Sequence, residues 1–169
     1  MNLRCYMNKI FSKMFYIIFI VSLNATAVIG DLQIDGNIRN KNHENAFILK
    51  ADDFAKMQKT TIKTTTSWTQ KDRQIIFQGV KVEDILKIAG AHGKTLRMSA
   101  LNDYWVDIPI TDVDRYGIIL ADTMDGQKLK TRNFGPYFVI YPLDDYPTKL
   151  NSPTYLSRFI WQVNRITVL

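Results

Sequence analysis

Hydrophobic and polar positions alternate along the chain in short runs, which predicts many strands and few helices. Residues 32–38, LQIDGNI, alternate with a period of two, as expected of a strand that buries one face. Further strands are predicted at residues 46–50, 60–70, 73–79, 95–100, 104–110, 118–124, 137–141 and 165–169. Because YFVIY at 137–141 is apolar on both faces, we predict it to be a central, fully covered strand.

The clearest helical pattern lies at residues 80–89. Its apolar side chains follow the spacing i, i+3, i+4, i+7, and Gly90 stands at the expected C-terminal stop. The members of this apolar face are Val82, Ile85, Leu86 and Ala89. A brief helix capped by residues 51–53 is predicted at 52–58, a helical turn at 111–117 and a long loop at 142–155. This inventory predicts an α+β fold, with a mixed, mainly antiparallel sheet and short helices.

The first 30 residues have the pattern of a secretory signal peptide. Three basic residues without an acid precede the nine-residue apolar run FYIIFIVSL, and residues 25–27, ATA, supply small residues for cleavage. We therefore expect cleavage near Ala27 or Gly30 and a periplasmic or secreted domain at residues 31–169. Nine apolar residues are too few to span a bilayer as a helix, which takes about 20, so no stable membrane span is expected after cleavage; the alternative is an uncleaved N-terminal anchor.

Removing this segment changes the charge and the thiol content of the protein. The net charge of +6 loses three basic residues and no acids and falls to +3, a scattered excess that does not favour nucleic-acid binding. Cys5, the one cysteine in the sequence, departs with the signal. The mature chain is then expected to form no disulfide and no cysteine-ligated metal site.

Two familiar kinds of site are not supported by their spacing. GAHGKT at 90–95 lacks the first glycine of a phosphate loop and follows a helix instead of leading into one. His43 and His92 stand in separate polar loops without metal-ligand spacing. The acids Asp103, Asp107, Asp144 and Asp145 leave two interpretations open: carboxylates that converge for acid-base work or a hard cation, or solvated turn residues.

The order of the pieces resembles a known family. The resemblance is based on a strand before Trp68, then FQGVKVEDILKIAG, LRMSALNDYWVDIPI, DGQKLKTRNFGPYFVIYP, and Trp161 before a last strand. Over residues 46–169 they resemble the molybdopterin-binding domain of sulfite-oxidase-like oxidoreductases. The most specific pieces are Phe77-x-Gly79-Val80 and the stretch from Gly126 to Pro142.

The resemblance implies a molybdenum held by a cysteine thiolate, which in some members lies four residues before a tryptophan. Counting back from Trp68 leads to Thr64, whose hydroxyl is a poor ligand for such a metal. An arginine often found two residues after the family's Gly-Pro is replaced by Phe138. A pterin phosphate could still meet basic side chains, or these could form a solvated basic edge; they are Lys128, Lys130, Arg132 and either Lys71 or Arg73.

We therefore expect a small secreted relative that lacks the metal-ligating cysteine and retains the cleft as a binding site. The residues expected there are Thr64, Thr66, Trp68, Asn102, Tyr104, Arg132, Asp144, Asp145 and Tyr146. Rings beside hydroxyls and amides suit a small polar ligand, and an envelope protein is the other expected partner. No cofactor is expected to be bound, and no catalytic residue is assigned. The alternatives are an oxidoreductase that holds molybdopterin without a cysteine, and an adaptor without a ligand.

Overall fold

The computed structural model describes residues 30–70 and 72–169, and this part of the chain forms ten strands and several short helices. The strands are β1 (Leu32–Gly36), β2 (Phe47–Leu49), β3 (Thr60–Thr64), β4 (Ile75–Lys81), β5 (Thr95–Ala100), β6 (Trp105–Pro109), β7 (Ile119–Met124), β8 (Gln127–Lys128), β9 (Phe138–Ile140) and β10 (Val163–Val168). The helices are α1 (Ala51–Lys56), α2 (Val82–Ala89), α3 (Ile110–Tyr116), α4 (Pro147–Leu150) and α5 (Pro153–Leu156), with a 3-10 turn η1 (Leu143–Asp145). The signal peptide predicted at 1–30 falls, apart from Gly30, outside the described residues.

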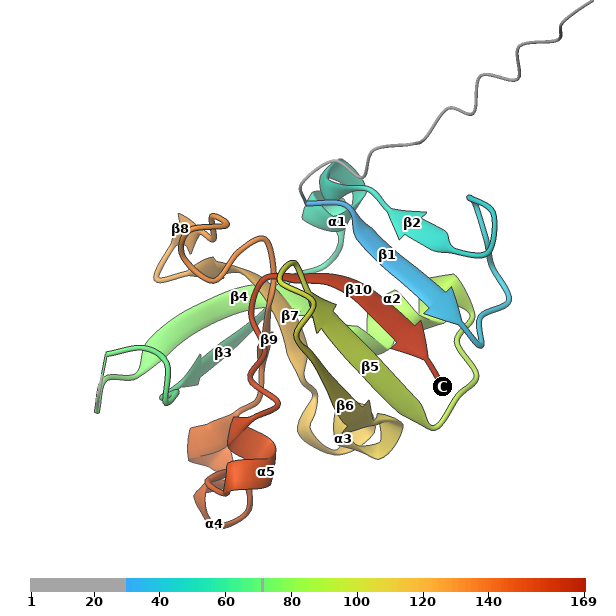
Figure 1. The fold of residues 1–169 in the computed structure, drawn as a ribbon. Coiled ribbons are helices and arrows are strands. Elements are labelled where there is room, and N and C mark those ends of the chain that lie inside the picture. The colour runs from blue at the N-terminus through green and yellow to red at the C-terminus, as the bar shows by residue number, and fades with distance from the viewer. Residues whose placement is uncertain (1–29, 71) are drawn as a thin grey trace, which may run out of the picture.

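The strands form two sheets. The first has the order β2-β1-β10-β5-β6; the second has the order β3-β4-β7-β8, and β9 also pairs with β7. Only β1 and β10 run parallel among the paired strands of the described residues. Figure 1 shows the two sheets adjoining, with α4 and α5 beyond the end of β9. The α+β class and the mainly antiparallel pairing are confirmed, while the division of the strands into two sheets was not predicted.

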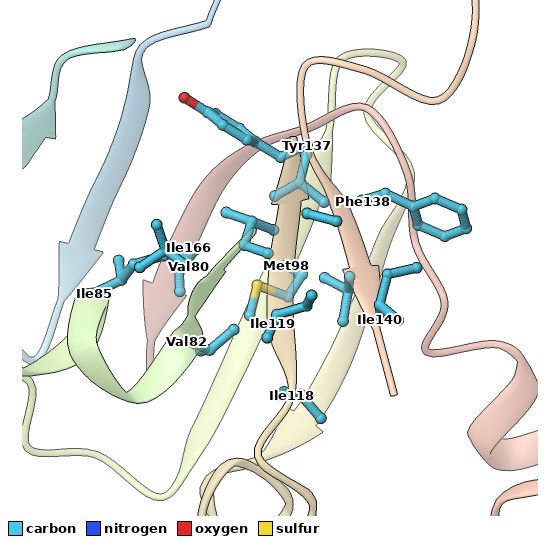
Figure 2. Packing of buried hydrophobic residues seen from close by; sticks show 14 of the residues in the cluster. Val80, Val82, Ile85, Met98, Ile118, Ile119, Tyr137, Phe138, Ile140 and Ile166 are labelled. Atoms are coloured by element: carbon cyan, nitrogen blue, oxygen red, sulfur yellow. The ribbon is translucent and has the colours of Figure 1, made fainter. Parts of the chain in front are cut away.

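A single hydrophobic core joins the two sheets. On β5 the buried side chains alternate strictly, with Leu96, Met98 and Ala100 facing inward. Figure 2 shows Met98 and Ile166 of the first sheet gathered in one buried cluster with side chains of the second. Because both sheets bury a face in the same cluster, removing large side chains here would weaken both.

A β-bulge in β4 lets consecutive residues reach the core. The pairing of β4 with β7 shifts its register between Gln78 and Gly79, so that both Gly79 and Val80 are buried. The backbone of β7 lies very close to Gly79: a Cβ atom there would lie 2.2 Å from the carbonyl oxygen of Leu120. The glycine is therefore required by contact with the neighbouring strand.

Helix α2 follows the predicted pattern, with Val82, Ile85, Leu86 and Ala89 buried. Gly90 ends it in the left-handed conformation, with φ of 63°. The helix begins two residues later than predicted, because Val80 and Lys81 still pair with β7.

Helix α1 is capped from outside its own sequence, and the predicted capping by residues 51–53 is wrong. Lys50 occupies the N-cap position without a side-chain hydrogen bond. The buried carboxylate of Asp31 instead accepts a hydrogen bond from the Ala51 amide at 3.1 Å, and it forms an ion pair with Lys50 Nζ at 2.7 Å. Asp52 and Asp53 lie in the first turn, where the helix dipole still favours them.

Strand β9 is fully buried, as predicted, but it is not central. It pairs with β7 alone among the named strands, and its other edge is covered by the segment before β10, where Val139 donates to the carbonyl oxygen of Ile160 at 2.9 Å. The central strand of this sheet is β7, whose residues 119–122 are buried on both faces. Apolar residues on both faces show that a strand is covered, but the covering need not be another strand.

The segment predicted as a loop at 142–155 contains η1, α4 and α5. A polar network holds the residues on both sides of this segment: the carboxylate of Asp112 accepts hydrogen bonds from the Tyr141 hydroxyl at 3.0 Å and from Arg158 at 2.6 Å. α3, the residue that follows β9 and the residues after α5 are thereby joined at one carboxylate. No helix within the described residues is long and apolar enough to cross a membrane.

Candidate functional site

The threonine-rich row at 60–70 is a strand for only half its length. β3 ends at Thr64, and the residues that follow form turns. The hydroxyl oxygen of Thr66 accepts hydrogen bonds from the amides of Trp68 at 3.2 Å and Thr69 at 3.1 Å. This local bonding gives the backbone partners that replace a strand ladder, and it leaves Trp68 45% exposed.

Thr64 and Asp144 belong to a connection between β3 and η1. The fully buried hydroxyl of Thr64 accepts a hydrogen bond from the Asp144 amide at 3.2 Å. The Asp144 carboxylate in turn accepts from the Thr65 amide at 3.0 Å, the Thr65 hydroxyl at 2.6 Å and Gln74 at 2.8 Å. Burial raises the pKa of Asp144, but these hydrogen bonds outweigh burial and hold the pKa below its ordinary value.

The turn after β3 contributes Trp68 to a cavity of about 420 Å³, which we call the aromatic pocket. Three segments far apart in the sequence build it: the turn after β3, the β5–β6 hairpin and the stretch between α5 and β10. Its lining residues are Trp68, Ala100, Asn102, Tyr104, Ser157, Phe159, Ile160 and Trp161. The size is within the range of small-molecule sites, about 300–1,000 Å³.

Two tryptophans form one wall of the aromatic pocket. The rings of Trp68 and Trp161 lie 4.9 Å apart between centroids and are inclined at 59°. Phe134 and Phe138 support Trp161 from behind with edge-to-face contacts, at centroid distances of 5.8 and 6.2 Å. Trp161 is thus held by packed neighbours, while Trp68 is half-exposed on a turn.

The backbone is strained at two residues next to Trp161: Phe134, which packs against its ring, and Gln162, which follows it in the chain. Phe134 has a φ of 64° and Gln162 a φ of 59°, a left-handed conformation that large side chains rarely adopt. The backbone amide of Gln162 donates to the carbonyl oxygen of Phe134 at 3.1 Å. The side-chain amide of Gln162 donates to the backbone carbonyl oxygen of Thr131 at 2.6 Å. Backbone strain of this kind collects at binding sites, because the surrounding structure must be built to hold it.

The polar groups of the aromatic pocket are neutral. The side-chain oxygen of Asn102 accepts a hydrogen bond from the Tyr104 amide at 3.2 Å. The hydroxyl of Ser157 donates a hydrogen bond to the carbonyl oxygen of Thr154 at 2.8 Å. The amide nitrogen of Asn102 therefore remains a donor, and the oxygen of Ser157 remains an acceptor. No lining residue of this pocket, within the described part of the chain, carries a charge.

The structure brings together three of the residues expected in the cleft, Trp68, Asn102 and Tyr104. The others lie outside the lining: Thr64 and Asp144 form the connection described above, and Thr66 holds the turn. Asp145 and Arg132 are exposed, and Tyr146 packs edge-to-face against Tyr116 at 5.2 Å.

Pocket residues that the sequence did not single out are Ala100, Ser157, Phe159 and Ile160, and Trp161 was noted only as a marker of the last strand. The one signal that pointed to them is that tryptophan, beside a run of apolar residues.

The acids and the basic residues are distributed elsewhere. Asp107 forms a two-point ion pair with Arg97, at 2.9 and 3.0 Å. Residues 30–70 and 72–169 contain no group of three or more His, Cys, Asp or Glu side chains placed to hold a metal. Lys128 and Lys130 line a separate cavity of about 280 Å³, and Arg73 pairs with Asp125 at 2.7 Å. Lys71 and Cys5 lie outside the described residues.

The fold of this chain is similar to that of a solved structure. The crystal structure of the sulfane dehydrogenase SoxCD from Paracoccus pantotrophus superimposes with a TM-score of 0.63 at 17% sequence identity, covering 82% of this chain. The chain spans 37% of the SoxCD chain that it matches. At this identity the likeness shows the fold alone, and it confirms the sulfite-oxidase-like fold that the sequence resemblance predicts. No family model matches the chain, and no curated protein matches it.

The residues present do not fit a molybdenum bound in the manner of that family. The Thr64 oxygen already accepts the Asp144 amide and is fully buried. The described residues contain no buried side-chain nitrogen or oxygen that lacks a hydrogen-bond partner and could be satisfied by a cofactor. The aromatic pocket also offers no cation to a pterin phosphate.

Proposed function

We propose that the domain is exported and acts as a binding module, and that the aromatic pocket receives a small polar organic ligand. The observation that carries this proposal is the composition of the pocket: two tryptophans, an amide side chain and two hydroxyl-bearing side chains are among the residues that line about 420 Å³. Aromatic rings supply contact area, and the few polar groups supply orientation. Export is inferred from the basic and apolar pattern of the first 30 residues.

The exposure of two aromatic side chains of the pocket supports a site where a ligand would cover them. Trp68 and Tyr104 are 45% and 51% exposed, although both are large aromatic side chains. A ligand that covered them would remove apolar surface from water, which favours binding by about 25 cal/mol per Å² before the costs of association. Large exposed rings around a concave surface are typical of interaction sites.

The proposal is tested by thermal shift of the purified, exported protein against a metabolite panel. We expect at least one polar organic compound to raise the melting temperature of the wild type and to lose its effect in Trp68→Ala. Trp105→Ala is the matched control, because Trp105 is equally exposed, at 50%, but lies outside the pocket and stacks on Arg97. A flat panel, or equal shifts in Trp68→Ala, would overturn the proposal; capture of an envelope protein alone would favour the adaptor role.

The rival function is a molybdopterin-dependent oxidoreductase without a cysteine ligand. The fold likeness to a chain described as a sulfane dehydrogenase is the observation in its favour. Metal analysis of protein exported from a host that makes the cofactor separates the two functions. Near-stoichiometric molybdenum would overturn the binding-module proposal, whereas an empty protein would remove the rival. Thr64→Cys should not gain molybdenum, because the side chain at this position is buried against the Asp144 amide.

A further inference from the structure

The charge of the aromatic pocket limits the class of ligand that it accepts. Its lining consists of apolar, amide and hydroxyl side chains. The nearest basic residue along the chain, Arg158, is held by the carboxylate of Asp112 at 2.6 Å and lies over the ring of Tyr155. A charged ligand would therefore lose hydration without meeting an opposite charge, which is unfavourable.

The shape of the tryptophan wall limits the class further. Trp68 and Trp161 touch each other, since their centroids are only 4.9 Å apart, so no ring can enter between them. Their 59° inclination makes a bent wall, against which a flat bicyclic compound could stack on only one ring. A puckered ring can direct C–H bonds at both aromatic faces, which carry partial negative charge.

The polar side chains of the aromatic pocket favour a ligand that both donates and accepts hydrogen bonds. Asn102 offers its amide nitrogen as a donor, Ser157 offers its oxygen as an acceptor, and Tyr104 has a hydroxyl that can serve as either. Neighbouring hydroxyl groups on one ring satisfy all three requirements.

Resting on the proposed binding function, we infer that the ligand of the aromatic pocket is an uncharged saccharide. One pyranose ring packs its C–H face against Trp68 and Trp161, and its hydroxyls bond Asn102, Ser157 and Tyr104. The neutrality of the lining disfavours charged ligands, the bent aromatic wall disfavours flat ones, and the mixed donor and acceptor edge matches the hydroxyl groups of a sugar ring.

The test is a titration of the exported protein, followed by tryptophan fluorescence, with matched probes. The neutral probes with charged counterparts are methyl glucoside, matched by glucuronate, and N-acetylglucosamine, matched by glucosamine; methyl galactoside is a further neutral probe, and adenine is the flat compound. We expect at least one neutral probe to bind about tenfold or more tightly than its charged counterpart. Trp68→Ala should abolish this binding, Asn102→Ala should weaken it about five- to tenfold, and Trp105→Ala should leave it unchanged.

Three results would overturn the saccharide inference: binding of adenine without any saccharide, equal binding of charged and neutral sugars, or saccharide binding that survives Trp68→Ala. Each of them leaves the proposed binding function standing if the metabolite panel still gives a shift that depends on Trp68. When neither the sugar probes nor the panel produce a response, both proposals fall. Melting curves of Trp68→Ala and Asn102→Ala show whether lost binding reflects lost folding.

Discussion

Asp144 accepts hydrogen bonds from Thr65 and Gln74 and thereby fastens the end of β3 to η1. Its neighbour Asp145 is exposed, and within the described residues its carboxylate makes no hydrogen bond or ion pair, although its amide donates to the carbonyl oxygen of Pro142 at 3.1 Å. The sequence presents these two acids identically, because the difference depends on residues 70 to 79 positions earlier in the chain. Their separate roles could not be predicted from local pattern.

Replacing Asp144 with alanine should destabilise the protein by about 1–3 kcal/mol. The substitution leaves the amide and hydroxyl of Thr65 without their acceptor near the buried end of β3. Urea denaturation of the wild type and the variant gives the difference in free energy of unfolding. Asp145→Ala should change it by less than about 0.5 kcal/mol, and equal effects of the two substitutions would contradict the assignment.

The same carboxylate should contribute to the pH dependence of stability. Its folded pKa is lowered, so its contribution is present above the unfolded value of about 3.9 and is lost as pH falls through the folded pKa. The difference in unfolding free energy between the wild type and Asp144→Asn should therefore shrink as pH falls below about 4. Denaturant titrations between neutral and acidic pH check this, and a difference that grows toward acid would refute it.

Among the elements, those whose signals are local were predictable. Helix α2 follows from its apolar spacing and Gly90, and the turn at Asp125 and Gly126 joins β7 to β8 with φ of 48° and 73°. The turn at Trp68 was predicted as strand because threonine favours strands, yet the hydroxyl of Thr66 competes for the backbone there. Propensity alone does not decide between these outcomes.

Gly79→Ala should destabilise the second sheet by about 3 kcal/mol or more. The added methyl group would lie 2.2 Å from the Leu120 oxygen and 2.4 Å from the Ala121 Cα, both backbone atoms that cannot move independently. Gly126→Ala is the control, because a Cβ there meets open space and the cost is limited to its positive φ, about 1 kcal/mol. Chemical denaturation of both variants measures the difference, and a smaller loss for Gly79→Ala would contradict the close approach of β7.

At the scale of the whole molecule, the sequence predicted the fold better than the site. The resemblance brought Trp68, Asn102 and Tyr104 into one cleft, and the aromatic pocket contains all three. It did not reveal that Ser157, Phe159 and Ile160 complete the lining. Convergence of a turn, a hairpin and the segment before β10 is a tertiary property, and no local period records it.

Buried tyrosines should make the folded molecule sensitive to alkaline pH. Burial raises the pKa of both Tyr137 and Tyr141, whose hydroxyls donate to the Gly30 carbonyl at 2.6 Å and to Asp112. Above pH of about 10 these tyrosines lose protons in the unfolded chain but not in the folded one, so stability falls as pH rises, by about 1.4 kcal/mol per pH unit for each. Tyr141→Phe should remove one such contribution, and unchanged slopes between pH 10 and 11 would contradict it.

The position of β10 has a consequence for the order of events during synthesis. The last strand lies between β1 and β5, so the first strand has no partner on that side until residues 163–168 are available. Contacts of such long sequence separation form slowly, because a large loop must close first. The ribosome must therefore release nearly the whole polypeptide before the first sheet can close, whereas the strands of the second sheet are all available earlier.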